Sequence, residues 1–131
     1  IYKQFFGTRI DTVALRLSDG SGLSRNNRIS ASHFCDLLEY MTTSPMANEF
    51  FETLPVAGRN GTISDLCKGS AGEGRVFAKS GTMTGIKSYA GYIKTVNGKT
   101  LAFALIVNGF SCSQSTVKQQ MEILLNQLAQ Y

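Results

Sequence analysis

Two short runs of side chains in this 131-residue sequence could together carry out acyl transfer. The first is Ser24-Arg25-Asn26, which directly follows a turn of small and polar residues. The second is Lys79-Ser80-Gly81-Thr82. A serine ester forms and breaks through a tetrahedral oxyanion, so the reaction needs a proton relay, an oxyanion hole and a clamp for a carboxylate. The Ser24 hydroxyl, placed beside the Lys79 ammonium, could pass a proton to the leaving amine.

The second run also has the residues that a peptide-binding edge requires. Gly81 has no side chain, so a substrate could lie along the strand edge as an added strand. The hydroxyls of Ser80 and Thr82, together with Lys79, could bind the terminal carboxylate of a peptide. Each run alone is short enough to occur by chance, and a solvated lysine at a strand end is the simpler alternative.

The other reactive side chains do not predict a second kind of chemistry. His33 is the only histidine and lies near the start of an amphipathic pattern, so we interpret it as a surface or boundary histidine. One histidine and three widely spaced cysteines argue against a zinc site, and we expect no metal or cofactor. Three buried thiols are the preferred interpretation of Cys35, Cys67 and Cys112. A Cys35–Cys67 disulfide is the alternative in an oxidising compartment.

The composition is that of one globular domain. Hydrophobic residues make up 43% of the chain, which excludes intrinsic disorder. No stretch approaches the roughly 18 apolar residues of a transmembrane helix. The net charge is +4, but the basic residues are scattered, so we expect no nucleic-acid partner.

Three elements are predicted for the first half of the chain: a strand over Thr8–Leu17, a helix over Ser30–Met41, and a helix from Ser44-Pro45 to Leu54. Alternating apolar residues indicate the strand. Apolar residues at helical spacing indicate the first helix, with Ser30 or Ser32 as its N-cap. A capping serine followed by proline indicates the start of the second helix.

Three strands and a final helix are predicted for the second half. The strands are expected over Arg75–Lys79, Tyr89–Val96 and Thr100–Val107. Asn97-Gly98 is a strong hairpin signal, so we expect the last two strands to pair, with the first strand beside Tyr89–Val96. The final helix has an apolar stripe that should cover one face of the sheet: Val117, Met121, Leu124, Leu125 and Leu128. The third strand is apolar on both sides, which predicts that both of its faces are covered, at least one of them by a layer of helix. The predicted fold class is α+β, an antiparallel sheet with packed helices.

Longer blocks of the sequence resemble one enzyme family. The Ser24 and Lys79 runs match, in order, the second and third motifs of penicillin-recognising serine acyl-transferases. Further blocks are similar to those of S13-type D-alanyl-D-alanine carboxypeptidases, the class C low-molecular-mass penicillin-binding proteins: Asp19–Arg25, Leu54–Gly58 with Gly61-Thr62, Gly74–Gly85, Ala90–Tyr92 and Val107–Gly109. This resemblance covers nearly the whole chain from about Ser18. The sequence has K-S-G where the family usually has K-T-G, which keeps the hydroxyl.

The resemblance implies the C-terminal part of a β-lactamase- or transpeptidase-like domain. Its expected activity is that of a serine D-Ala-D-Ala carboxypeptidase or endopeptidase, acting through an acyl-enzyme. Its expected partners are peptidoglycan stem peptides and β-lactam antibiotics. It would therefore work in the periplasm or on the outer face of the cytoplasmic membrane.

The resemblance also implies roles for the site residues. The predicted catalytic residues are Ser24, Asn26 and Lys79. Asn27 would take the role of Asn26 if the loop matches the family motif one residue out of register. Substrate binding falls to Ser80, Gly81 and Thr82. We expect Ser24 and Lys79 to lie within hydrogen-bond reach, roughly 2.6 to 3.2 Å, with Asn26 lining the same cleft.

One departure from the family concerns the nucleophile. The family carries it in an S-x-x-K motif well before the S-x-N element, and nothing upstream of Ser24 fits. The sole S-x-x-K string runs from Ser115 to Lys118, where Ser113 or Ser115 is better interpreted as a helix N-cap. Because the chain also begins at Ile1 without Met, we expect residues 1–131 to be a single partial domain. The nucleophile would then lie in a missing N-terminal part, and the chain alone would be inactive.

Two alternatives stay open from the sequence. A serine β-lactamase shares all three motifs, although the E-x-x-L-N pattern of class A enzymes is absent between Ser24 and Lys79. A cell-wall-binding module could keep the fold without the chemistry. An inactive protein, however, has no physical need to retain Ser24, Asn26 and Lys79. The sequence favours neither carboxypeptidase nor endopeptidase action.

Overall fold

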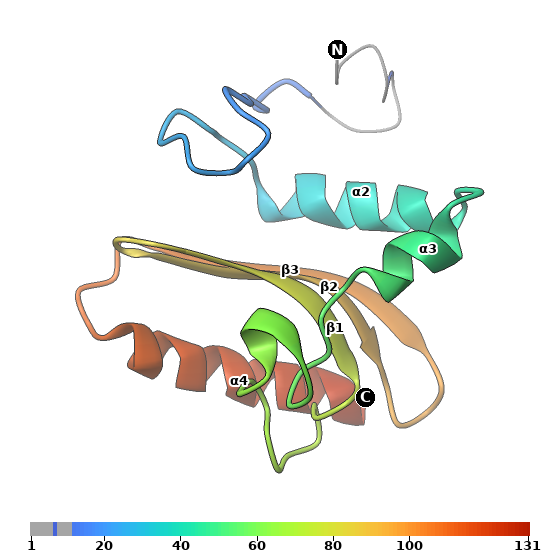
Figure 1. Cartoon of the computed structure of the whole chain (residues 1–131). Helices are drawn as coiled ribbons and strands as arrows, with labels where there is room; N and C mark the ends of the chain where they lie inside the picture. The colour runs from blue at the N-terminus through green and yellow to red at the C-terminus, as the bar shows by residue number, and fades with distance from the viewer. Residues whose placement is uncertain (1–6, 8–11) are drawn as a thin grey trace.

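The computed structural model describes residue 7 and residues 12–131 (Figure 1). Its elements in chain order are α2 (Ala31–Thr42), α3 (Ala47–Glu52), the 3-10 turn η1 (Gly61–Ile63), β1 (Val76–Met83), β2 (Ile86–Lys94), β3 (Thr100–Asn108) and α4 (Gln114–Gln130). The strands form one antiparallel sheet in the order β1-β2-β3. Figure 1 shows α2 and α3 on one face of this sheet and α4 on the other. The predicted α+β class is therefore confirmed.

The β2–β3 hairpin forms around the predicted turn. The Thr95 N–H donates to the Lys99 carbonyl oxygen at 2.8 Å. Gly98 takes a φ of 78°, a left-handed conformation that glycine adopts without strain. The predicted antiparallel pairing of these two strands is confirmed.

The β1–β2 hairpin is longer than predicted. Gly85, at a φ of 68°, allows a turn so tight that pairing begins at Met83 and Ile86. β1 therefore continues to Met83, four residues beyond the predicted end at Lys79. As a consequence, the Lys79–Thr82 run lies inside the strand. The sequence had placed it at the end of the strand.

The main core lies between the sheet and α4. Val76 and Ala78 of β1 are fully buried against a line of α4 residues with 0 to 6% exposure: Val117, Met121, Leu125 and Ala129. These four residues recur every fourth position, which places them on one helix face. Leu124, predicted as part of this stripe, is 41% exposed and borders a groove beside Val107 and Phe110. The prediction that Leu124 is part of the buried stripe is wrong, because Leu124 lies at the margin of the helix face that packs against the sheet.

The other face of the sheet packs against α2 and α3. The Tyr92 hydroxyl donates to the Leu38 carbonyl oxygen of α2 at 2.6 Å. The Phe51 ring of α3 lies 4.6 Å from the ring of Phe77, centroid to centroid. Because side chains alternate along β1, Lys79 emerges on this same face as Phe77.

Ser30 is the N-cap of α2, which settles the choice between Ser30 and Ser32. Its hydroxyl accepts the His33 N–H at 3.2 Å, and its own N–H donates to His33 Nδ1 at 3.0 Å. His33 is thus a buried capping residue with 6% exposure, and not the surface or boundary histidine that we expected. The reciprocal bonds explain its burial, because they satisfy the polar atoms of the helix start.

Two predicted boundaries are wrong. Of the strand expected over Thr8–Leu17, positions 8–11 lie outside the described residues, and 12–17 are irregular apart from one bridge between Arg16 and Arg28. Val13 in this stretch is 91% exposed. The second helix begins at Ala47, since Ser44-Pro45 forms a turn in which Ala47 N–H donates to the Ser44 carbonyl oxygen.

All three cysteines are free. Cys67 is buried in the core beneath α4, whereas Cys35 is half-buried on α2, across the sheet. The sheet separates these two thiols, so the disulfide alternative is wrong. Cys112 is exposed, so the prediction of three buried thiols holds for Cys67 alone. Among residue 7 and residues 12–131, no helix has the length and apolar character needed to cross a bilayer.

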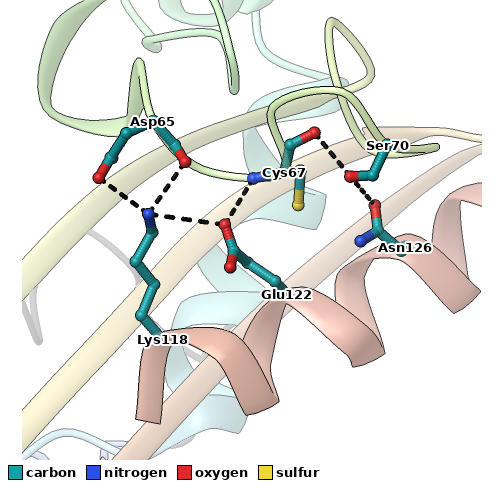
Figure 2. A network of polar contacts seen from close by, with 6 residues as sticks. All are labelled: Asp65, Cys67, Ser70, Lys118, Glu122 and Asn126. Carbon is teal, nitrogen blue, oxygen red and sulfur yellow. Dashed lines mark hydrogen bonds and ion pairs between the residues drawn. The ribbon is translucent and has the colours of Figure 1, made fainter. Parts of the chain in front are cut away.

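Polar side chains of α4 fix the segment 65–72, which leads into β1 (Figure 2). Lys118 Nζ donates to the Asp65 carbonyl oxygen at 2.9 Å and pairs with Asp65 Oδ2 at 2.8 Å. Glu122 lies 3.6 Å from the same ammonium and accepts the Cys67 N–H at 2.8 Å. The second contact supports Cys67 at a φ of 53°, which is costly for a residue with a side chain.

Asn126 continues this set of contacts toward β1 (Figure 2). Its Oδ1 accepts hydrogen bonds from the Ser70 hydroxyl at 2.8 Å and from the Gly72 N–H at 2.7 Å. Gly72 is buried and has no room for a side chain, since a Cβ would lie 2.9 Å from Cys67 Sγ. The contacts of Lys118, Glu122 and Asn126 thus hold the segment that sets where β1 begins.

We expect Leu125→Ala to lower the free energy of unfolding by about 2–5 kcal/mol, because it empties a fully buried position of α4. The matched change Leu124→Ala, one residue earlier on the same helix, should cost about 0.5 kcal/mol or less. Urea unfolding midpoints of both variants at unchanged m-values measure the difference. Equal losses at the two positions would contradict the packing of α4 described above.

Candidate active site

The outer edge of β1 is open from Lys79 onward in the described part of the chain. Up to Ala78 the segment 55–57 covers it: Ala57 N–H donates to the Val76 carbonyl oxygen at 2.9 Å, and Ala78 N–H donates to the Pro55 carbonyl oxygen at 3.0 Å. Peptide groups of alternate residues point to the same side of a strand. Those of Ser80 and Thr82 therefore face the open edge, ready to pair with an added strand.

The side chains of the Lys79–Thr82 run surround this edge. Lys79 is exposed, and its Nζ donates to the Ser80 carbonyl oxygen at 2.7 Å. The Ser80 hydroxyl is half-buried and the Thr82 side chain is exposed. One ammonium and two hydroxyls thus lie along the same short stretch of backbone. This set of donors suits a carboxylate.

Gly81 lies beside a side chain of the neighbouring strand. It pairs with Ser88 of β2, and a Cβ at position 81 would lie 2.5 Å from the Ser88 hydroxyl oxygen. The sequence had explained this glycine by the approach of a substrate alone. The Ser88 hydroxyl could rotate away from such a Cβ, so the neighbouring strand adds only a weak steric limit.

The Ser24 loop is folded around the carboxylate of Asp19. This carboxylate accepts hydrogen bonds from the Ser21 hydroxyl at 2.7 Å, from the Asn27 side-chain amide at 2.7 Å and from the N–H groups of Gly22 and Ser24. The bond from Ser21, followed by the one from Asn27, lowers the pKa of Asp19 to about 2. A carboxylate that accepts several bonds stays ionised far into acid.

The loop distinguishes Asn26 from Asn27. The Asn27 amide is occupied within the loop, because its Oδ1 also accepts the Ser18 N–H at 2.7 Å. The Asn26 side chain is exposed and makes no hydrogen bond with any described residue, while its N–H donates to Ser24 Oγ at 3.2 Å. Asn26 is therefore the residue whose amide is available to a ligand.

The structure does not test the predicted approach of Ser24 and Asn26 to Lys79. Within the described residues, no hydrogen bond or ion pair joins Ser24 or Asn26 to Lys79. The loop directly precedes α2, and Lys79 emerges on the face of the sheet that α2 covers. Their close approach stays a prediction.

The S-x-x-K string in α4 has a structural role. Ser113 caps the helix by accepting the Thr116 N–H at 3.1 Å, and Ser115 bonds to the Ser113 hydroxyl at 2.7 Å. Burial lowers the pKa of Lys118, but its contacts with Asp65 and Glu122 outweigh this effect and raise it. A lysine held as a cation is a poor general base, so the predicted cap interpretation is confirmed at Ser113.

Thr62 is the residue of this region to which sequence reasoning assigned no role. Its hydroxyl oxygen lies 2.7 Å from Ser80 Oγ. The only signal for it in the sequence was its place in the Gly61-Thr62 block, which pointed to the family without pointing to the site. Among the described residues, no cluster of three or more His, Cys, Asp or Glu side chains forms a metal site.

Comparison with known proteins connects this chain to one family. The profile of the D-Ala-D-Ala carboxypeptidase 3 (S13) family matches residues 2–130. A D-alanyl-D-alanine carboxypeptidase of Actinomadura sp. is 42% identical over 110 residues, which cover 80% of this chain and 20% of the relative. The D-alanyl-D-alanine carboxypeptidase DacB of Haemophilus influenzae is 36% identical over 103 residues, covering 72% and 20%. The chain spans about a fifth of the length of these relatives.

A solved structure agrees with these matches. Penicillin binding protein 4 (dacB) from Haemophilus influenzae superimposes with a TM-score of 0.86 and 31% identity, covering 98% of this chain and 30% of that chain. The same protein complexed with a β-lactam matches with a TM-score of 0.86 as well. The predicted resemblance and the predicted fold are thereby confirmed.

Asp19 should titrate far below an ordinary aspartate, for which the pKa is about 3.9. Because the folded pKa is lowered to about 2, the loop is stabilised above about pH 4, and this stabilisation is lost as the pH falls toward 2. In an NMR titration, the amide signals of Gly22 and Ser24 should move with a midpoint near pH 2. Asp19→Asn should abolish that movement. A midpoint near pH 4 in the unmodified chain would mean that the loop bonds do not form.

Proposed function

The chain belongs to the D-Ala-D-Ala carboxypeptidase 3 (S13) family, and we propose that it supplies the substrate-binding strand and the proton relay of a serine D-Ala-D-Ala carboxypeptidase or endopeptidase. The substrates would be peptidoglycan stem peptides. The observation that carries this proposal is the open edge of β1, which starts where the segment 55–57 stops covering the strand. Carboxylate-binding side chains follow directly, at Ser80 and Thr82.

The substrate would bind as a strand added to β1. Its backbone would pair with the outward N–H and C=O groups of Ser80 and Thr82. The Lys79 ammonium already lies at this edge, 2.7 Å from the Ser80 carbonyl oxygen, so it adds positive charge where the peptide ends. The Asn26 amide would contact the peptide from the Ser24 loop.

Cleavage would then proceed by transfer of the acyl group to a serine. A serine hydroxyl outside this chain attacks the carbonyl carbon that precedes the terminal residue, and a C–O bond forms while the C–N bond breaks. Ser24 passes the hydroxyl proton to the leaving amine, with the Lys79 ammonium beside it. The Thr82 N–H on the open edge would stabilise the oxyanion. Water then hydrolyses the ester and restores the serine.

Residues 1–131 would form the C-terminal portion of a transpeptidase-like domain, completed by an N-terminal part that carries the nucleophile. Two observations support this. No S-x-x-K motif precedes Ser24, and the family relatives are about five times as long as the matched region. Peptidoglycan as substrate places the protein in the periplasm or on the outer face of the cytoplasmic membrane. β-Lactams, one of which a related structure contains, would acylate the same serine.

The isolated 131-residue chain should release no D-alanine from a D-Ala-D-Ala peptide and take no label from a fluorescent penicillin, because its nucleophile is absent. The full-length protein should do both. Mass spectrometry of the labelled peptide identifies the serine. Label on Ser24 or Ser115 of the isolated chain would contradict the proposal. A full-length protein that is never labelled would favour a wall-binding module, and one that rapidly hydrolyses penicillin would favour a β-lactamase.

In the full-length protein, Lys79→Ala should slow acylation by penicillin by about 100-fold or more, because it removes the charge beside the relay. Lys79→Arg should also slow it, since a forked guanidinium does not replace a compact ammonium. Lys99→Ala, at the exposed β2–β3 turn, is the matched control and should acylate normally. Normal acylation in Lys79→Ala would remove Lys79 from the site.

A further inference from the structure

The Thr62–Ser80 pair brings a hydroxyl from outside the catalytic motifs to the open edge of β1. Thr62 lies in η1, 18 residues before Ser80, and the two hydroxyl oxygens are 2.7 Å apart. Thr62 is exposed and Ser80 is half-buried, so the pair lies at the surface where a substrate would arrive. This is the only side-chain hydrogen bond of Ser80 among the described residues.

The position of Thr62 is fixed by its neighbours in η1. Ile63 is 1% exposed in the core, and its carbonyl oxygen accepts the Gly58 N–H at 3.1 Å. Gly61 takes a φ of 60°, and a Cβ there would lie 2.9 Å from the Pro55 ring. Thr62 is thus held between a buried residue and a position that requires glycine. The packing of η1 therefore places the backbone of Thr62 where its hydroxyl can reach Ser80.

The direction of the hydrogen bond between the two hydroxyls decides what Ser80 can offer. Each hydroxyl has one proton and can both donate and accept. If Ser80 donates to Thr62, its proton is unavailable. If Thr62 donates to Ser80, the Ser80 proton is free to point at the open edge. A carboxylate only accepts, so its binding requires the second direction.

We propose that Thr62 is a positioning residue that donates its hydroxyl proton to Ser80 and thereby aims the Ser80 proton at the terminal carboxylate of the substrate. This inference rests on the proposed function, because it assigns Ser80 to that carboxylate. The resulting chain from Thr62 through Ser80 to the carboxylate is polarised along its length, which strengthens each bond. The nearby Lys79 ammonium adds to the same field.

The role proposed for Thr62 should affect a peptide that ends in a carboxylate but not one that ends in a carboxamide. A peptide that ends in a carboxamide carries no charge, and its terminal group can both donate and accept. It can therefore bind Ser80 whichever way the Thr62–Ser80 bond points. Loss of the Thr62 hydroxyl should weaken only the peptide that ends in a carboxylate.

The test uses the full-length protein and two peptides that differ only in a terminal carboxylate or carboxamide. Thr62→Val should lower the ratio of kcat/KM for the carboxylate to kcat/KM for the carboxamide by about 3- to 10-fold, the worth of one neutral hydrogen bond. The loss should fall on KM, with kcat changed by less than about 2-fold. Thr62→Ser keeps the hydroxyl and should keep the ratio at its wild-type value. Thr62→Ala, a second variant without the hydroxyl, should lower the ratio as Thr62→Val does.

Two controls separate this role from a structural one. Thr100→Val makes the same chemical change at an exposed threonine of β3 and should leave the ratio unchanged. Adding Thr62→Val to Ser80→Ala should lower the ratio no further, because Thr62 acts through Ser80.

An equal loss on both peptides, an unchanged ratio, or an additive loss in the double variant would overturn the proposal. A wild-type protein that cleaves neither peptide would overturn the proposed function and, with it, the role of Thr62. Normal wild-type cleavage with no effect of Thr62→Val would overturn the role of Thr62 alone.

Discussion

The contacts between α4 and the segment 65–72 determine where the rest of the site lies. Two backbone N–H groups of this segment, at Cys67 and Gly72, find their acceptors in Glu122 and Asn126 and not in regular secondary structure. A buried N–H without an acceptor costs about 1–3 kcal/mol, so the segment cannot leave the helix cheaply. Figure 2 shows these contacts between α4 and the segment. Because the segment leads directly into β1, its contacts with α4 fix the start of the strand that carries Lys79.

α4 fills the core with one of its faces and binds the segment 65–72 with the adjacent face. One line of residues at every fourth position, centred on Leu125, fills the core, and the next line, Lys118, Glu122 and Asn126, binds the segment 65–72. β1 divides its tasks in a similar way along its length. Its first residues, Val76 and Ala78, are fully buried, and its next ones leave the outer edge open. The packing of the first half therefore holds in place the second half, which carries the candidate site residues.

The sequence predicted best where a local rule decides the structure. Asn97-Gly98 sets a hairpin by turn geometry alone, and Ser30 caps α2 through atoms three residues apart. Prediction failed where the outcome depends on distant parts. Leu124 has the right spacing for the core stripe, but the sheet covers only the helix face centred beside it. Thr62 has no local signature, because its partner Ser80 lies 18 residues away and meets it only once η1 packs against β1.

An open strand edge is a hazard, since it can pair with the edge of any other chain. β1 limits this hazard through the same residues that suit it for a peptide end. The Lys79 charge opposes pairing with another copy of this strand, which would bring two ammonium groups together. Ser80, Gly81 and Thr82 offer little apolar surface to a hydrophobic strand. The segment 55–57 already covers the edge beside Val76 and Ala78. Under the proposed function, a strand that carries a negative charge at its end would meet none of these obstacles, because its charge would pair with Lys79 and its oxygens would accept the hydroxyl protons. The selectivity that we propose for this edge would therefore come from the strands that it repels as much as from the peptide that it binds.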